Sequence, residues 1–75
     1  MKIGFSEKNL ILFKKEKYDN GDKYEGYFKN GKREGKGILY YNNGDRKMGD
    51  YLNDNPIGKH VLFLNNGEIT SKFYN

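Results

Sequence analysis

The side chains best suited to acid–base or metal chemistry are sparse in this chain. His60 is the only histidine, and there is no cysteine. The ten Asp and Glu side chains are dispersed among fourteen Lys and Arg side chains, without a carboxylate pair whose surroundings would separate two pKa values for a general acid and base. A metal site needs three or four convergent donors, which one imidazole cannot supply. We therefore predict a protein that is not an enzyme and that binds no cofactor, metal or small-molecule substrate.

The most basic and glycine-rich stretch is KNGKREGK, residues 29–36. A loop of this composition could cradle a phosphate, but its spacing differs from the Walker motif and no helix is predicted after it. The segment is therefore predicted to be a turn. Its cations could still attract an anionic membrane surface, each contributing about 1 kcal/mol. They are Lys29, Lys32, Arg33 and Lys36.

An internal repeat organises the chain, because Asn-Gly pairs return at intervals of 23 residues, at Asn20-Gly21, Asn43-Gly44 and Asn66-Gly67. The same interval relates Phe28, Tyr51 and Tyr74, Gly26 and Gly49, Gly35 and Gly58, and Leu39 and Leu62. It divides the chain into a repeat over residues 18–40, a degenerate repeat over 41–63 and a partial terminal repeat over 64–75. Residues 1–17 are predicted to be a degenerate N-terminal hairpin or cap.

The Asn-Gly pairs also predict where the chain reverses. Asn-Gly between extended segments is a strong signal for a type I′ hairpin turn, whose two central residues both need positive φ. A return turn is expected within KNGKREGK and, in the next unit, within NDNPIGK, where Pro56 is unsuited to a central strand. The predicted fold class is therefore all-β, a single-layer antiparallel meander of stacked β-hairpins.

Period-two alternation predicts that the two faces of this sheet differ. One face alternates rings with glycines and carries Tyr24, Gly26, Phe28, Gly35, Gly37, Leu39 and Tyr41. A glycine inside a strand lets another group approach the backbone, so rings such as Phe28 and Tyr51 are expected to lie over glycines of neighbouring strands. The opposite face mixes apolar residues with lysines; the apolar ones include Ile38, Tyr40, Val61 and Phe63.

The start of the chain allows two interpretations. Ser6 is a candidate helix N-cap, but the apolar residues that follow it show no sustained helical stripe. The segments MKIGF and LILFKKEKY, separated by SEKN, are instead typical of two strands of a hairpin, which is the interpretation we favour.

The composition fits one small domain or part of a longer repeat array. The chain has 75 residues, of which 35% are hydrophobic and 16% aromatic, so thin aromatic packing is favoured over a thick core. Its longest apolar run, residues 10–13, is too short to span a membrane, and its start does not resemble a signal peptide. We expect a cytoplasmic location, with the membrane periphery or the cytoskeleton as alternatives. The net charge of +4 mildly favours acidic partners.

The segment YEGYFKNGKREGKGILYYNNG resembles the MORN (membrane occupation and recognition nexus) repeat. The matching positions are Tyr24, Gly26, Phe28, Gly31, Gly35, Gly37, Tyr41 and Gly44. The second unit departs from the family pattern at Lys47, Asp54 and His60, which stand where Tyr, Gly and Gly are expected. Since His60 occupies a glycine column, we interpret it as a tolerated substitution. The resemblance implies an open meander of hairpins that serves protein contacts, self-association or attachment to phosphoinositide membranes, without catalysis by the repeats themselves.

The predicted function is a scaffold or interaction module that binds a protein partner or itself through the aromatic-glycine face or a sheet edge. The candidate partner-binding residues are Tyr24, Phe28, Leu39, Tyr41, Tyr51, Phe73 and Tyr74. The alternative role of these rings is packing within the sheet. A second hypothesis is peripheral binding to anionic membrane through the basic turn, lost when Lys32 and Arg33 become Glu. A third is binding of single-stranded nucleic acid, which the interleaved acids and the missing RNP pattern disfavour.

An open meander leaves two edges that invite another chain unless charges guard them. The final segment, EITSKFYN, carries only Glu68 and Lys72 as charges and ends in two rings. We therefore expect a homodimer or docking within a larger assembly that buries this segment or the Tyr24, Phe28 and Tyr51 face.

Overall fold

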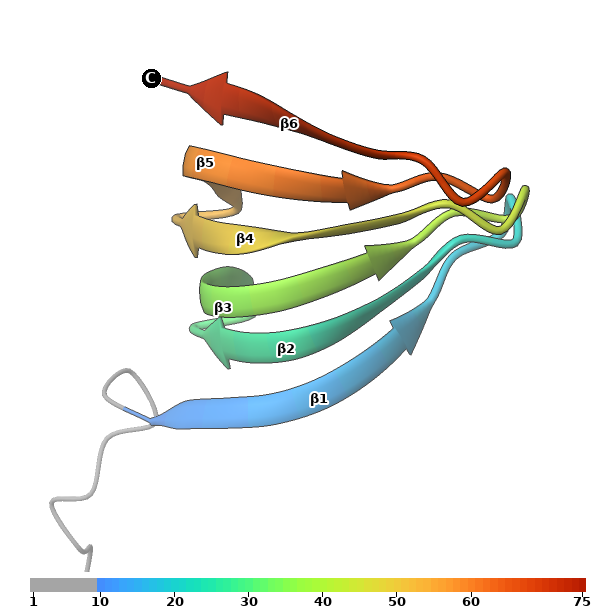
Figure 1. The fold of residues 1–75 in the computed structure, drawn as a ribbon. Coiled ribbons are helices and arrows are strands. Elements are labelled where there is room, and N and C mark those ends of the chain that lie inside the picture. The colour runs from blue at the N-terminus through green and yellow to red at the C-terminus, as the bar shows by residue number, and fades with distance from the viewer. Residues whose placement is uncertain (1–9) are drawn as a thin grey trace, which may run out of the picture.

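A computed structural model describes residues 10–75, which form six antiparallel strands in one sheet and contain no helix. The strands are β1 (Ile11–Lys17), β2 (Lys23–Lys29), β3 (Lys32–Tyr40), β4 (Arg46–Leu52), β5 (Asn55–Phe63) and β6 (Ile69–Tyr74). They lie side by side in chain order, as Figure 1 shows. The all-β, single-layer antiparallel meander predicted from the sequence is confirmed. Within residues 10–75, no helix is long and apolar enough to cross a membrane.

At the start of the chain, β1 matches the second strand of the expected hairpin and pairs with β2 from Ile11↔Lys29 to Lys17↔Lys23. The helical alternative is therefore wrong for residues 11–17. The expected first strand, MKIGF, lies outside the described residues.

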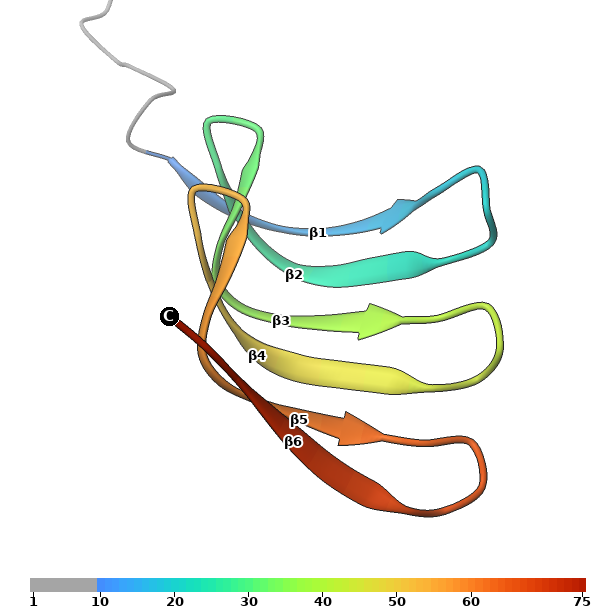
Figure 2. The same ribbon diagram turned by 90° about the horizontal axis from the view of Figure 1, so that it is seen from above.

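The 23-residue period of the sequence reappears in the strands. Strands β2 and β4 begin at Lys23 and Arg46, and β3 and β5 begin at Lys32 and Asn55, so corresponding strands start 23 residues apart and have equal lengths. The hairpins β2–β3 and β4–β5 consequently have the same shape, and in Figure 2 their tips curl away from the sheet to the same side.

The three repeated Asn-Gly pairs all lie at chain reversals, as predicted, but the predicted turn type is wrong there. Only the glycines Gly21, Gly44 and Gly67 have positive φ at these pairs. The Gly21 N–H donates to the Tyr18 carbonyl at 3.0 Å, and the Tyr18 N–H donates to the Asp22 carbonyl at 2.9 Å. This pattern is a three-residue loop with glycine in the left-handed position, which needs one positive φ instead of two.

Type I′ turns occur instead at the other ends of the strands. Asn30 and Gly31 have φ of 55° and 78°, and the flanking residues Lys29 and Lys32 pair directly. In the second unit Asn53 and Asp54 have φ of 49° and 74°, between Leu52 and Asn55. Asn and Asp tolerate this conformation because their short polar side chains compensate for the steric cost.

Hydrogen bonds link each Asn-Gly loop to the next one along the edge of the sheet. The Asn42 N–H donates to Asp22 Oδ1 at 2.8 Å, and its Nδ2 donates to the Asn20 carbonyl at 2.5 Å. One repeat later, Asn65 makes the same two bonds to Asp45 and Asn43, at 2.8 and 2.6 Å. These bonds hold the loops in the row seen at one end of the strands in Figures 1 and 2.

A bulge in each long strand bends the sheet. Between the pairs Gly26↔Gly37 and Phe28↔Arg33, β3 has three residues opposite the single residue Tyr27 of β2. Strand β5 has the same irregularity between Met48↔Val61 and Asp50↔Ile57. Gly35 and Gly58 sit in these bulges with φ of 80° and 70°, a conformation that favours glycine. The bulges therefore fold the hairpin tips over one face.

Pro56 is a correction to the sequence analysis, since it lies inside β5 opposite Tyr51 instead of in a loop. The β5–β6 ladder ends at Gly58↔Tyr74, so Pro56 extends past the last pair of β6. Its missing N–H therefore removes no bond on that side, which is the edge situation in which strands accept proline.

Candidate binding surfaces

A continuous row of rings covers one surface, which we call the ring face. From β2 to β6 it consists of Phe28, Tyr24, Tyr51, His60 and Tyr74. Successive ring centroids are 5.4, 5.3, 5.3 and 4.9 Å apart, and every pair meets edge to face, the geometry that aromatic quadrupoles favour. The row crosses β2, β4, β5 and β6 and is the core of the described chain, with Leu39 packed against it.

The glycines of the strands make room for two of these rings. A Cβ on Gly37 would stand 1.8 Å from the Tyr24 hydroxyl, and a Cβ on Gly49 would stand 2.4 Å from the His60 ring. The prediction that rings lie over glycines of neighbouring strands is therefore confirmed, but the rings are Tyr24 and His60 and not the named examples Phe28 and Tyr51. A side chain at either glycine would displace a core ring.

His60 is a structural member of the ring face and not merely a tolerated substitution. In the first unit Tyr24 fills the space over Gly37; the corresponding positions of the second unit are Lys47 and His60. In the first unit the ring therefore stands at the position of Tyr24, and in the second unit it stands at the position that corresponds to Gly37. His60 is fully buried, its Nε2 lies 2.8 Å from the Asp50 carbonyl, and the Lys47 Nζ donates to the Tyr74 hydroxyl at 2.9 Å.

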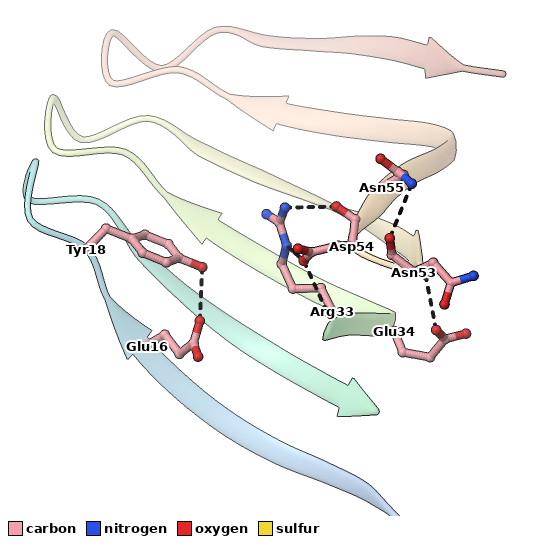
Figure 3. Close-up of polar contacts among 7 residues, drawn as sticks. All are labelled: Glu16, Tyr18, Arg33, Glu34, Asn53, Asp54 and Asn55. Carbon is pink, nitrogen blue, oxygen red and sulfur yellow. Dashed lines mark hydrogen bonds and ion pairs between the residues drawn. The ribbon is translucent and has the colours of Figure 1, made fainter. Parts of the chain in front are cut away.

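The Arg33 side chain covers two rings of the ring face. Its guanidinium lies 5.6 Å from the Tyr24 centroid and 4.8 Å from the Tyr51 centroid, within cation–π range. Asp54, in the tip of the second hairpin, accepts from Arg33 Nε at 2.7 Å, and its carbonyl accepts from Nη2 at 2.9 Å (Figure 3). Beside it the Asn53 N–H donates to Glu34 Oε1 at 3.2 Å. These contacts join the two hairpin tips over the rings.

The ion pair and the rings shift several pKa values. The hydrogen bond from Arg33 lowers the pKa of the Asp54 carboxyl below its usual value. Burial lowers the pKa of the Arg33 guanidinium, but the hydrogen bond and the negative charge of Asp54, with the nearby phenols, together outweigh it and raise that pKa. Burial raises the pKa of Tyr24 to about 12 and also raises that of Tyr51. The ring face therefore holds neutral phenols in a protected environment.

The predicted partner-binding residues consequently fall into three groups by burial. Tyr24, Phe28 and Tyr51 have exposed fractions of 0, 3 and 3% and cannot present their rings to a partner. Leu39, Tyr41 and Tyr74 are half-buried, whereas the Phe73 side chain is 70% exposed. The structure does not bring these residues together as one accessible surface, because most of them form the core.

The opposite surface, which we call the open face, is apolar and largely uncovered. Register places twelve large apolar residues on it: Ile11, Phe13, Tyr27, Ile38, Tyr40, Met48, Leu52, Ile57, Val61, Phe63, Ile69 and Phe73. Seven of them are 40–70% exposed, whereas Ile38, Tyr40, Ile57, Val61 and Phe63 are partly covered by their neighbours. Of these residues, Ile69 and Phe73 lie on the edge strand β6.

A hollow of about 440 Å³ lies in the open face across β1 to β5. Phe13 and Tyr27, which meet edge to face at 5.2 Å, line it together with Ile38 and Met48. The other lining residues are Glu25, Lys36, Gly37, Gly49, Asp50 and Lys59. A hollow of this size and lining is typical of sites that accept an apolar group.

The two edges of the sheet are guarded differently. Within residues 10–75, β1 pairs only with β2, and β6 pairs only with β5. Strand β1 carries Lys14, Lys15, Glu16 and Lys17, whereas β6 has Lys72 as its single charge. Charges on an edge strand discourage pairing with another chain, so β6 is the more receptive edge.

The four cations of the predicted basic turn do not act as one group. Lys29 and Lys32 are exposed and flank the Asn30-Gly31 turn. Lys36 lies at the bulge, 3.5 Å from the Asp50 carboxylate, and Arg33 lies on the other face against the rings. Among residues 10–75, no group of three or more His, Asp or Glu side chains could hold a metal ion.

Sequence reasoning missed Phe13, Tyr27 and Met48 as surface residues and Arg33 as a core residue. The alternation of β2 did place Tyr27 opposite Tyr24, which is the signal that could have identified the open face. Arg33 lies two residues before Gly35, so alternation assigns it to the ring face, where it pairs with Phe28; that it covers the rings depends on the bulge that follows it.

A family model described as MORN repeat matches residues 24–46, from the Tyr24 ring in β2 to the first residue of β4. A search of the curated proteins found no match to the chain.

Proposed function

We propose that this chain, in which residues 24–46 are a MORN repeat, is a non-catalytic interaction module that pairs the β6 edge with a strand of a second copy. The observation that carries the proposal is the unguarded β6 edge. Its backbone groups face no neighbouring strand in the described chain, and Ile69 and Phe73 are 67 and 70% exposed. Pairing would extend the sheet and cover both side chains.

The experiment is light scattering over a dilution series, with thermal unfolding at each concentration. The wild type is expected to be dimeric at high concentration, with a Tm that rises with concentration because association stabilises the folded state. Phe73→Lys should be monomeric throughout. Ile11→Lys, which places the same charge at the other edge, should behave as the wild type. A folded wild-type monomer with a concentration-independent Tm would contradict the proposal.

Anionic membrane is a second candidate partner, favoured by the exposed Lys29 and Lys32 at the tip of the first hairpin. Each cation contributes about 1 kcal/mol near an anionic surface. Since Arg33 is engaged by Asp54, the informative variant is Lys29→Glu/Lys32→Glu. It should abolish co-sedimentation with anionic liposomes, whereas the ring-face control Lys14→Glu/Lys72→Glu should retain it. Equal sedimentation of all three proteins would remove the tip from consideration.

A further inference from the structure

We propose that the open face binds an acidic, amphipathic segment of another protein, with an apolar side chain in the hollow and carboxylates against the surrounding lysines. This site is separate from the β6 edge, because Phe13, Tyr27 and Met48 lie on β1, β2 and β4. The proposal therefore goes beyond strand pairing and stands or falls independently of it.

The apolar part of the proposed site is exposed and preformed. The side chains of Phe13, Tyr27 and Met48 are 56, 42 and 40% exposed. Side chains of this size are usually buried in a core or an interface, and here no other part of the described chain covers them. The hollow they line has Gly37 and Gly49 at its base, where no side chain projects. Recesses of this kind accept the aromatic or aliphatic anchors that contribute most of the binding energy of protein interfaces.

The charge of the open face specifies the partner further. Of the fourteen Lys and Arg residues two precede residue 10, and register places eight of the other twelve on this face. One of the ten acids precedes residue 10. Glu34, in the bulge, has no register partner and accepts from the Asn53 N–H, and register places only Glu25 and Asp50 of the other eight on this face. Both are already paired, Glu25 with Lys15 at 3.9 Å and Asp50 with Lys36 at 3.5 Å.

Six cations of the open face therefore have no carboxylate at ion-pair distance within the described part of the chain. They are Lys17, Lys23, Lys29, Lys32, Arg46 and Lys59. Such a field attracts acidic partners and repels basic ones, which gives both a faster association rate and selectivity. Lys59 lines the hollow itself, so a carboxylate next to an apolar anchor would meet it.

An anionic membrane shares the charge requirement but fits the shape less well. A bilayer surface is bound by side chains that protrude into it, whereas the rings here line a recess. A recess favours a single projecting side chain, which a protein segment can supply. Membrane binding is therefore an alternative outcome of the test.

The test uses the full chain and a synthetic peptide of about 18 residues, with Phe and Leu on one helical face and Glu on the other. Backbone amide NMR shifts are followed during titration. We expect shifts at Phe13, Tyr27 and Met48 and saturable binding. The peptide with every Glu replaced by Gln should bind at least about tenfold more weakly. Vesicles of phosphatidylcholine and phosphatidylserine are titrated in parallel.

Two matched pairs of variants locate the site. Lys59→Glu and Lys72→Glu make the same charge change on opposite faces of β5 and β6, and only the first should weaken binding, by about tenfold. Leu12 and Phe13 are neighbours with similar exposure on opposite faces, so Phe13→Ser should weaken binding and Leu12→Ser should not. Circular dichroism confirms that each variant is folded.

Four results would overturn the proposal: no binding of the Glu peptide, equal binding of the Gln peptide, equal losses within a matched pair, or vesicle binding that Phe13→Ser abolishes while the peptide fails to bind. None of these depends on the oligomeric state. Conversely, loss of the dimer in Phe73→Lys does not affect Phe13, so the two proposals can fail separately.

Discussion

At the scale of single residues, the second unit keeps its core although its ring stands at a different position from the ring of the first unit. Tyr24 over Gly37 in the first unit corresponds to Lys47 beside His60 in the second. The Lys47 ammonium turns toward Tyr74. Burial lowers the Lys47 pKa, but the hydrogen bond to the Tyr74 hydroxyl and the surrounding phenols together outweigh burial and raise it. Departures from the repeat pattern at these two positions therefore compensate one another.

This compensation predicts strong coupling between the two positions. His60→Gly should leave a cavity over Gly49 and cost about 3 kcal/mol, and Lys47→Tyr should overpack the His60 ring and cost about 1–3 kcal/mol. The double variant Lys47→Tyr/His60→Gly again places a Tyr over a Gly. Its loss of unfolding free energy should therefore be smaller than the sum of the two single losses by at least about 1 kcal/mol. Urea unfolding of the four proteins measures the coupling. Additive losses would show that the positions are independent.

The buried phenol of Tyr24 makes the fold sensitive to alkali. Its pKa is about 12 in the folded chain and 10.0 without burial, so its contribution is complete below about pH 10 and is lost as pH rises through the folded value. Tyr24→Phe should therefore unfold at higher pH. It should also retain stability at neutral pH, because this hydroxyl has no hydrogen-bond partner among residues 10–75. Tyr27→Phe, on the open face, is the control and should leave the alkaline transition unchanged.

At the scale of elements, the hairpins β2–β3 and β4–β5 are joined at both ends. At one end Asn42 and Asn65 bond to the preceding loop, and at the other Arg33 bonds to Asp54 of the next tip. Each connection runs between units and not within one. The relative position of the hairpins is therefore set by polar contacts at the strand ends as well as by the rings between them.

The connection between the tips predicts a dependence on acidic pH. The folded pKa of Asp54 lies below its model-compound value of 3.8, so its stabilising contribution is present above that value and is lost as pH falls through the folded pKa. The carboxylate is half exposed, which limits the ion pair to about 1 kcal/mol or less. Asp54→Asn preserves a residue that tolerates positive φ.

The urea midpoints of the wild type and Asp54→Asn should therefore differ at neutral pH and converge as pH falls through the folded pKa of Asp54. Asp19→Asn is the control, since its side chain makes no hydrogen bond or ion pair with another residue in the described range. A difference that persists unchanged in acid would mean that Asp54 acts through its backbone conformation instead of its charge.

At the scale of the whole molecule, the described chain is a one-dimensional stack. Each strand packs against its immediate neighbours in chain order, and the core is one row of rings on one side of a single sheet. In such an arrangement stability is approximately a sum of local terms and nearest-neighbour contacts. The edges must therefore be less stable than the centre, since each edge strand has one neighbour.

Hydrogen exchange should reveal this gradient. Below the concentration at which the chain associates, amides of β2, β3 and β4 should exchange most slowly, and those of β1 and β6 fastest. Gly49→Ala, which displaces His60, should accelerate exchange in β4 to β6 more than in β2. Uniform acceleration across all strands would indicate a single cooperative unit. At high concentration, slower exchange in β6 alone would accompany pairing of that edge.

The sequence by itself determined the period, the reversals at Asn20-Gly21, Asn43-Gly44 and Asn66-Gly67, and the single-layer meander. These features depend on local chemistry: the turn propensity of Asn-Gly and the alternation of residues along a strand. Alternation also grouped Tyr24 with Phe28 and opposed Tyr27 to both. It could not say which of the two faces would be covered, since both contain rings.

Only the tertiary structure decided that question. The bulges at Gly35 and Gly58 bend the hairpin tips over Tyr24 and Tyr51, and Arg33 and Asp54 then seal the rings. The number of residues in each loop likewise decided the turn type. The β5–β6 ladder ends at Gly58↔Tyr74, which decided that Pro56 can lie within β5. A bulge inserts residues without altering composition, so its effect on burial appears only when neighbouring strands are in register.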